Sequence, residues 1–320
     1  MTTPPDDTTR ADAGADDAPW ASVVVCSLNR RESLRRCLAS LAEQPGVAGI
    51  EALVVDNGSE DGTDESVRAM AADYPTRLRV VVEPRRGLSI ARNTGLEHAR
   101  GRVAVFVDDD VTFQEAWLDG LRAAFEGPGV VGAGGPIEPV FPAGTDAWFA
   151  EEALRQRDPT TGIFDRPGGE HAFDPRGTAT PRGGNMAVLR DLALELGGFR
   201  EDLGWGKGRV PGEETDLFVR VFATGRGEVR YLPPMAVNHH LDLERTNAAY
   251  ARKWHEGYGR ASIRMKGDEP VARRALRFVD QLGVFALNSV RSWTPGGRRS
   301  LRVLKKRWQA LGRLREMLGR

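Results

Sequence analysis

Residues 103–110, Val-Ala-Val-Phe-Val-Asp-Asp-Asp, form an apolar run that ends on three aspartates. A strand with one solvated face would alternate apolar and polar residues, so this run predicts a strand buried on both faces. Crowded carboxylates repel one another, and a hard divalent cation relieves that repulsion. The stretch therefore predicts a metal site at a strand's carboxyl end. The alternative is an acidic helix N-cap before Gln114.

Upstream of this stretch, a strand, a polar loop and a helix follow one another three times. The predicted strands are 22–26, 50–55 and 78–82, and the predicted helices are 32–41, 63–73 and 89–99. This alternation predicts an α/β fold with a parallel sheet that is covered on both faces. Ligands of such sheets bind at the carboxyl ends of the strands, where each polar cluster of this sequence also falls.

Downstream, residues 127–184 are rich in Gly and Pro and predict a loop-dominated acceptor region, with a short helical stretch that starts at Trp148 and Phe149. Regular structure then resumes after residue 189. Helices are predicted at 190–197, 213–224, 247–265, 270–291 and 298–318, with a short strand at 228–231. We expect a disordered acidic tail over 1–19, an α/β domain over 20–240 and a helical extension over 241–320.

Composition limits the function classes. The chain has 45 Lys and Arg against 45 Asp and Glu, and this zero net charge, without a recognition motif, argues against a nucleic-acid partner. Cys26 and Cys37 are its only cysteines, too few for a disulfide framework. Neither a secretory signal nor an apolar run of transmembrane length occurs, so we expect a cytoplasmic protein, free or at the inner face of the cell membrane.

Charge is unevenly distributed between the two ends. Residues 1–20 carry five Asp against one Arg, whereas residues 261–320 carry 15 Lys and Arg against four Asp and Glu, a net charge of +11. Basic amphipathic helices with tryptophan predict peripheral contact with an anionic membrane. Packing on the catalytic domain and a homodimer contact are the alternatives.

Six motifs follow one another in a characteristic order. They are 24–30, 56–59, 87–95, 108–110, 183–187 (Gly-Gly-Asn-Met-Ala) and 212–217 (Gly-Glu-Glu-Thr-Asp-Leu). In order and spacing they resemble the family 2 glycosyltransferases over residues 21–240. The resemblance implies the GT-A fold, with a mostly parallel central sheet flanked by helices. It also implies inverting transfer of a sugar from a nucleotide-diphospho-sugar donor, with Mn²⁺ or Mg²⁺ as cofactor.

The resemblance also assigns roles to individual residues. Asp56 would contact the nucleoside, Asp108 the ribose or the metal, and Asp110 the metal. Asn185 and Glu213 would face the donor sugar. His239 would join the metal shell, with a surface pair formed with His240 as the alternative. The nucleotide-sugar site is further expected to include Ser27, Asn29, Gly58, Arg92, Asp109 and Trp205.

The catalytic base of the family is the second acid of a Glu-Asp pair, which here is Glu214. This sequence has Glu at the position where the family has Asp, so the side chain is longer by one methylene. Glu213 and Asp216 therefore stay as alternatives for the base. Inverting transfer needs such a carboxylate within reach of the acceptor hydroxyl. Trp148, Trp205 and Trp254 could each stack on a sugar ring, and core packing is the competing interpretation.

The sequence leaves substrate and class alternatives open. UDP and dTDP are the commoner nucleotides in the family, and GDP is an alternative. A glycan, a lipid-linked glycan and a small metabolite all fit as acceptor.

A nucleotidyltransferase would show a Gly- and Lys/Arg-rich signature near its N-terminus, which is missing here. A non-catalytic nucleotide-sugar-binding subunit would lack the acids that follow Gly212.

Overall fold

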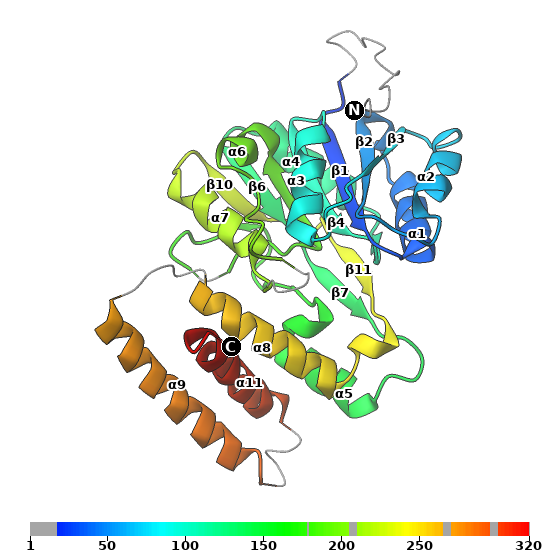
Figure 1. Ribbon diagram of the computed structural model, residues 1–320. Helices are drawn as coiled ribbons and strands as arrows, with labels where there is room; N and C mark the ends of the chain where they lie inside the picture. Colours follow the sequence, from blue (N-terminus) through cyan, green and yellow to red (C-terminus); the bar gives the residue numbers. More distant parts are fainter. Residues whose placement is uncertain (1–17, 178, 205–209, 265–269, 295–299, 320) are drawn as a thin grey trace, which may run out of the picture.

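The computed structural model describes residues 18–177, 179–204, 210–264, 270–294 and 300–319. An α/β domain lies above a group of helices from the C-terminal part of the chain (Figure 1). Residues 1–17 of the predicted acidic tail lie outside the described residues.

Four parallel strands form one half of the central sheet, in the order β3-β2-β1-β4. In their register Ser27 pairs with Asp56 and Cys26 pairs with Asp108, so the polar ends of these strands meet at one edge. The strands are β1 (Ala21–Ser27), β2 (Ile50–Asp56), β3 (Arg77–Val82) and β4 (Val103–Asp108).

The other half of the sheet is mixed, so the sheet as a whole agrees with the mostly parallel arrangement that the family resemblance implies. The order continues β9-β6-β10-β8, and β9 runs antiparallel to both β4 and β6. β9 was not predicted, because only its last four residues, 186–189, are apolar, and so short a run does not identify a strand or its direction. These strands are β6 (Val130–Gly134), β8 (His171–Ala172), β9 (Asn185–Leu189) and β10 (Glu228–Tyr231).

Helices flank the sheet, which confirms the predicted α/β class. Gly95 permits close packing of α3, because a Cβ there would lie 2.4 Å from Cγ1 of Val24 on β1. The helices are α1 (Arg31–Ala42), α2 (Thr63–Ala71), α3 (Leu88–His98), α4 (Trp117–Glu126), α6 (Arg190–Glu195) and α7 (Glu213–Ala223), with a 3₁₀ turn η2 (Val47–Gly49).

A small second sheet places the last strand of the α/β domain, β11, next to the aspartates that follow β4. It has the order β5-β11-β7, and His239 on β11 pairs with Val111 directly after Asp110. The backbone N–H of His240 also donates to the Asp110 carbonyl at 2.8 Å. The strands are β5 (Val111–Phe113), β7 (Ile137–Val140) and β11 (Val237–His240).

The remaining helices pack together below the α/β domain (Figure 1). Phe149 and Ala153 of α5 share a buried cluster with Ala251, Leu301 and Trp308, and Trp148 packs against this cluster. The C-terminal helices were predicted nearly to the residue. The elements are α5 (Ala147–Gln156), η3 (Pro159–Thr161), η4 (Leu243–Arg245), α8 (Ala248–Arg264), α9 (Val271–Arg291) and α11 (Leu301–Met317).

The expectation of a loop-dominated region over 127–184 is wrong in part. This region contributes β6 and β7 to the two sheets, whereas its helix α5 agrees with the short helical stretch expected from Trp148 and Phe149. Its strands are short and Gly- or Pro-containing, so sequence periodicity does not reveal them. No helix among the described residues is both long and apolar enough to cross a bilayer.

Candidate functional site

A cavity of about 530 Å³ opens at the carboxyl ends of β1 and β4. Side chains from β11, α7 and α8 complete its walls, together with residues 159–163. Eight of the predicted site residues line it: Ser27, Arg92, Asp108, Asp109, Asp110, Glu213, Glu214 and His239. The cavity therefore unites motifs that lie far apart along the chain.

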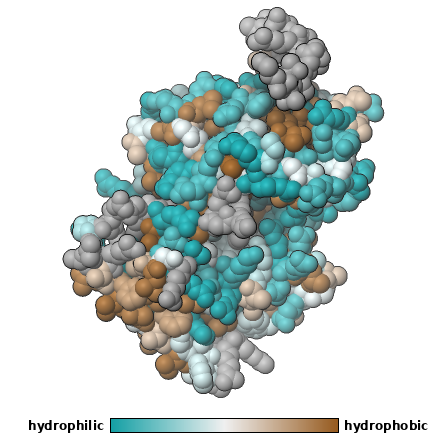
Figure 2. Space-filling model, viewed as in Figure 1, coloured by the Kyte–Doolittle hydropathy of each residue, from teal (hydrophilic) through white to brown (hydrophobic). Residues whose placement is uncertain are grey.

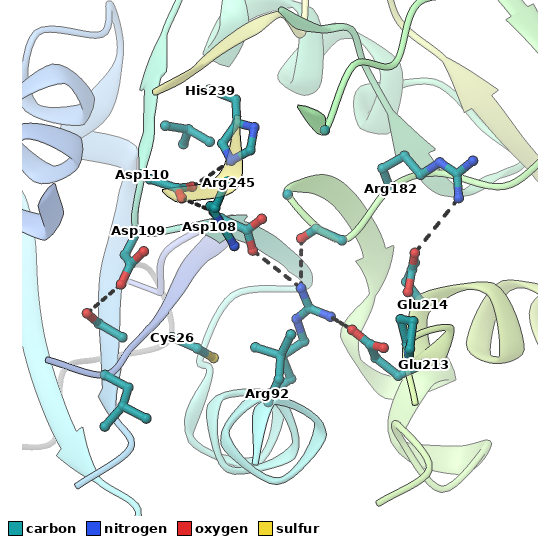
Figure 3. Close-up of a pocket in the computed structure, with 18 of the residues that line it drawn as sticks. Cys26, Arg92, Asp108, Asp109, Asp110, Arg182, Glu213, Glu214, His239 and Arg245 are labelled. Atoms are coloured by element: carbon teal, nitrogen blue, oxygen red, sulfur yellow. Dashed lines mark hydrogen bonds and ion pairs between the residues drawn. The ribbon is translucent and has the colours of Figure 1, made fainter. Parts of the chain in front are cut away.

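Asp108, Asp110 and His239 form a cluster on one wall of the cavity (Figure 3). One potential ligand atom from each lies within 4.8 Å of the other two. Nδ1 of His239 lies 3.0 Å from the Thr161 carbonyl, and because a carbonyl only accepts, this nitrogen carries the proton. Nε2 is thereby turned toward Asp110 Oδ1, 3.2 Å away. Such an outer hydrogen bond is typical of metal-binding histidines.

The donor atoms of this cluster fit a divalent cation. Asp110 Oδ1 is buried and accepts no hydrogen bond from any described residue. Two carboxylates suit Mg²⁺ or Mn²⁺, and a neutral imidazole favours Mn²⁺ of the two. The nearest partner of this buried oxygen is Nε2 of His239 at 3.2 Å, itself a potential ligand, and this arrangement suits a cation between them.

Two arginines also contact the aspartates. Asp110 Oδ2 lies 3.1 Å from Arg30 and 2.8 Å from Arg245. Burial by itself would raise the pKa of Asp110, but His239, Arg30 and Arg245 together hold it well below its ordinary value. Burial would likewise lower the pKa of His239, and the Asp110 carboxylate outweighs it, so that pKa is raised.

Asp109 points to the other side of β4. Its Oδ2 accepts a 2.7 Å hydrogen bond from the Ser27 hydroxyl, and its Oδ1 lies 3.3 Å from Arg30. Burial raises the pKa of Asp109 to about 7. Burial also raises the pKa of the nearby Cys26 thiol to about 12, so this cysteine is an inert wall residue.

Arg92 joins the aspartate wall to the start of α7 (Figure 3). Its side chain is only 4% exposed and lies 2.6 Å from Glu213 and 3.5 Å from Asp108. It also donates to the Gly183 carbonyl at 3.1 Å. Arg92 therefore neutralises two protein carboxylates, and its guanidinium is largely committed to them.

Glu214 stands in the first turn of α7. The helix begins directly after Gly212, whose φ of 125° is a conformation that favours glycine. Arg182 is the nearest ion-pair partner of Glu214, at 4.0 Å. Burial, followed by the charge of Glu213, raises the pKa of Glu214 to about 7.

Five predicted site residues lie outside the cavity lining. Asp56 accepts from the Ser59 backbone N–H, and Gly58 lies in the turn between them. The Asn29 N–H donates to the Ser59 hydroxyl, and its Oδ1 accepts from the Glu60 N–H. Asn185 is fully buried and hydrogen-bonds Trp117 and two backbone carbonyls, so its amide does not face the cavity. Asp216 is paired with Arg200 and Arg220. Trp205 lies outside the described residues.

The structure adds residues that the motifs did not single out. Arg30, Asn57, Arg182, Arg245 and Tyr250 line the cavity, and so does Trp254, which the sequence offered as a sugar-stacking candidate. Asn57 was detectable beside Asp56, because an Asn-Gly pair after a buried strand marks a functional turn. Arg245 and Tyr250 carry no local signal, since they approach the aspartates only through the chain reversal after β11.

A buried ionic cluster lies next to the segment 159–161, whose Thr161 carbonyl orients His239. Asp158 and His255 are fully buried, and Nε2 of His255 lies 3.1 Å from both carboxylate oxygens. Lys305 Nζ approaches the same carboxylate to 3.8 Å. Asp158 also accepts from the hydroxyl and N–H of Thr160, next to the Thr161 carbonyl that orients His239.

Asp158→Ala is expected to destabilise the protein by roughly 3–5 kcal/mol, because it removes the buried carboxylate that pairs with His255 and Lys305. Thermal unfolding measures the loss as a fall in Tm. The matched control is Asp191→Ala, whose carboxylate is 92% exposed and paired with Arg190. It should change stability by less than about 1 kcal/mol. Equal shifts for both variants would contradict the structural role of Asp158.

Comparison with known families gives one extended match. Residues 22–192 match the family described as Glycosyl transferase family 2. A curated relative, the glucosyl-dolichyl phosphate glucuronosyltransferase of Haloferax volcanii, is 30% identical over 245 residues. The alignment covers 75% of this chain and 75% of that protein.

Two solved structures share the fold. The mannosyltransferase PcManGT from Pyrobaculum calidifontis, in complex with GDP-Man and Mn²⁺, is 18% identical with a TM-score of 0.59, over 95% of this chain and 88% of that chain. S. aureus TarS, residues 1–349 in complex with UDP-GlcNAc, is 17% identical with a TM-score of 0.52, over 86% of this chain and 74% of that chain.

Proposed function

The chain belongs to glycosyl transferase family 2 and has the GT-A fold, and from this premise we propose that it is a metal-dependent, inverting enzyme. It moves a sugar from a nucleotide-diphospho-sugar to an acceptor hydroxyl. One observation carries the proposal. The cavity has on one wall three side chains that could hold a metal ion, and on the other a weakly paired glutamate of raised pKa (Figure 3).

Asp108, Asp110 and His239 would hold the cation, Mn²⁺ or Mg²⁺. When bound, it supplies positive charge to the departing nucleoside diphosphate. The Thr161 carbonyl keeps the His239 ring in the tautomer that leaves Nε2 free to coordinate. Arg30 and Arg245 lie next to these ligands, and their guanidinium groups are suited to bind diphosphate oxygens.

Glu214 is the proposed catalytic base. A base must be ionised near the working pH and must not be held by a strong cation. Glu214 meets both conditions, since its pKa is about 7 and its ion-pair distance to Arg182 is 4.0 Å. Its carboxylate would accept the proton of the acceptor hydroxyl as that oxygen attacks the anomeric carbon.

The two alternative acids are less suited to this role. Glu213 is held by Arg92 at 2.6 Å and accepts from the Gly212 N–H through its second oxygen. Asp216 is held between Arg200 and Arg220 and does not line the cavity. Both carboxylates are bound to cations, and a proton arriving on either would break an ion pair.

For the donor we propose UDP or dTDP as the nucleotide, with GDP as the alternative. The structural relatives bind both kinds, GDP-Man in the mannosyltransferase and UDP-GlcNAc in TarS. For the acceptor we propose a glycan, a lipid-linked glycan or a small metabolite. Tyr250 and Trp254 place aromatic rings on the α8 wall of the cavity, where a sugar ring of an acceptor could stack.

Calorimetric titration with UDP, dTDP and GDP tests the donor half of this proposal. One nucleotide should bind with Mn²⁺ present, and its affinity should fall by at least about tenfold when the metal is chelated. The loss is expected because the diphosphate then faces two aspartates without a bridging cation. Binding of none of the three nucleotides, with or without Mn²⁺, would contradict the assignment.

A further inference from the structure

Helix α9 presents an apolar face to the outside of the molecule. We define this outer α9 face as Leu276, Val279, Leu282, Leu287, Val290 and Trp293. Its side chains are between 44% and 75% exposed. With 100° between successive residues, they occupy a sector of about 140° around the helix. Figure 2 shows hydrophobic side chains gathered over the region of α9.

On the opposite side of α9, which packs against α11, the buried residues are polar, and the apolar Phe278, Val284 and Phe285 are partly buried beside them. Gln281, Asn288 and Ser292 are each at most 8% exposed. Gln281 accepts from Arg313 at 3.1 Å, and Ser292 accepts from Arg307 at 3.2 Å. An ordinary surface helix turns its apolar face to the core and its polar face to water. Along α9, by contrast, the buried residues are polar and large apolar side chains are exposed, so water is not the environment that its outer face fits.

The charges around this face are mostly positive. Arg273 and Arg291 are exposed on α9, and Arg302 and Lys306 are exposed on α11. Arg307 lies over the ring of Phe285 at 5.7 Å. The acids of these two helices are Asp280 and Glu316, and Glu316 is already paired with Arg260 and Arg264. The outer α9 face is thus an apolar strip on a pair of helices whose exposed charges are mainly basic, with Asp280 as an exposed acid of α9.

We propose that the outer α9 face docks on an anionic lipid bilayer. The apolar side chains would enter the boundary between head groups and acyl chains, while the adjacent Arg and Lys contact anionic head groups. Trp293, at the C-terminal end of the strip, is the residue type that favours this boundary. A second copy of the chain is a poorer partner, because pairing through α9 would bring two cationic surfaces together.

The test uses the full chain in a pelleting assay with sucrose-loaded vesicles. One vesicle population is phosphatidylcholine alone and the other contains about 30% phosphatidylglycerol. The wild type should bind the anionic vesicles at least about tenfold more strongly, and binding should weaken as salt rises. Equal binding to both populations, or to neither, overturns the proposal.

A double variant tests the face itself. Leu276→Glu with Val290→Glu changes two side chains that are 74% and 71% exposed, so folding should be preserved. Binding to anionic vesicles should fall by at least about tenfold. The matched control is Leu154→Glu with Val219→Glu, two exposed apolar residues on other helices, which should bind like the wild type. Wild-type binding by the α9 variant overturns the proposal.

The oligomeric state is measured on the same variants by analytical ultracentrifugation. The proposal expects no dissociation that is specific to the α9 variant. A dimer that the α9 substitutions split, combined with unchanged vesicle binding, identifies the face as a subunit interface and overturns the proposal. Neither result depends on sugar transfer, so this inference stands or fails separately from the proposed function.

Discussion

Asp110→Asn is expected to lower kcat/KM for sugar transfer by about 10³-fold or more, equivalent to roughly 4 kcal/mol of transition-state stabilisation. The substitution preserves the shape of the side chain but removes its negative charge. Asp110 supplies a buried oxygen of the proposed metal site and lies beside its other two ligands. Mn²⁺ affinity, measured by titration without donor, should fall together with activity.

The control for this variant is Asp73→Asn. Asp73 is exposed and does not line the cavity, so the control should leave both Mn²⁺ affinity and transfer unchanged. Thermal unfolding of Asp110→Asn checks the fold, because the variant also weakens the contacts with Arg30 and Arg245. A folded variant with wild-type Mn²⁺ affinity and wild-type transfer would show that Asp110 is not a metal ligand.

Glu214→Gln is expected to lower kcat by about 10²–10⁴-fold, the usual contribution of a positioned general base. Glutamine has nearly the same shape but cannot accept the acceptor proton. Donor affinity should change little, since the proposed donor contacts lie on the opposite wall of the cavity. Single-turnover rates and donor titration separate these two effects.

The pH profile gives this prediction a sign. Because the pKa of Glu214 is raised to about 7, the base is protonated and inactive below that pH and ionised above it. Wild-type kcat/KM should therefore fall about tenfold per pH unit below 7, and the residual activity of Glu214→Gln should lack this dependence. Full activity of Glu214→Gln, together with loss of activity in Glu213→Gln or Asp216→Asn, would show that the residue whose substitution abolishes activity is the base instead.

The first half of the α/β domain was predictable because its signals are local. β1 and β2 contain apolar runs, 23–26 and 52–55, each followed by a polar cluster and a helical pattern, and the apolar run of β4 ends on the aspartates. Parallel strands with helical connections place those clusters at one edge. The aspartates of β4 and the glutamates of α7 could be singled out for the same reason, since short motifs carry their chemistry in adjacent residues.

The second half of the domain was less predictable. β6 contains two glycines in five residues and β9 runs antiparallel, and neither property is encoded in a periodicity of apolar residues. Asn185 illustrates the consequence. Its motif suggested a sugar contact, whereas its amide is used to tie β9 to Trp117 and to the carbonyls of Pro136 and Met235.

The sequence by itself determined the fold class, the family resemblance and the acids that would perform the chemistry. Those features depend on residues adjacent in the chain and on short hydrophobic periodicities, and both can be read from the sequence. Only the tertiary structure decided that Arg245 reaches Asp110, 135 residues away, and that the polar face of α9 is the buried one. Contacts of this kind depend on how whole elements pack, and helix periodicity identifies two faces without saying which of them the neighbouring helix will cover.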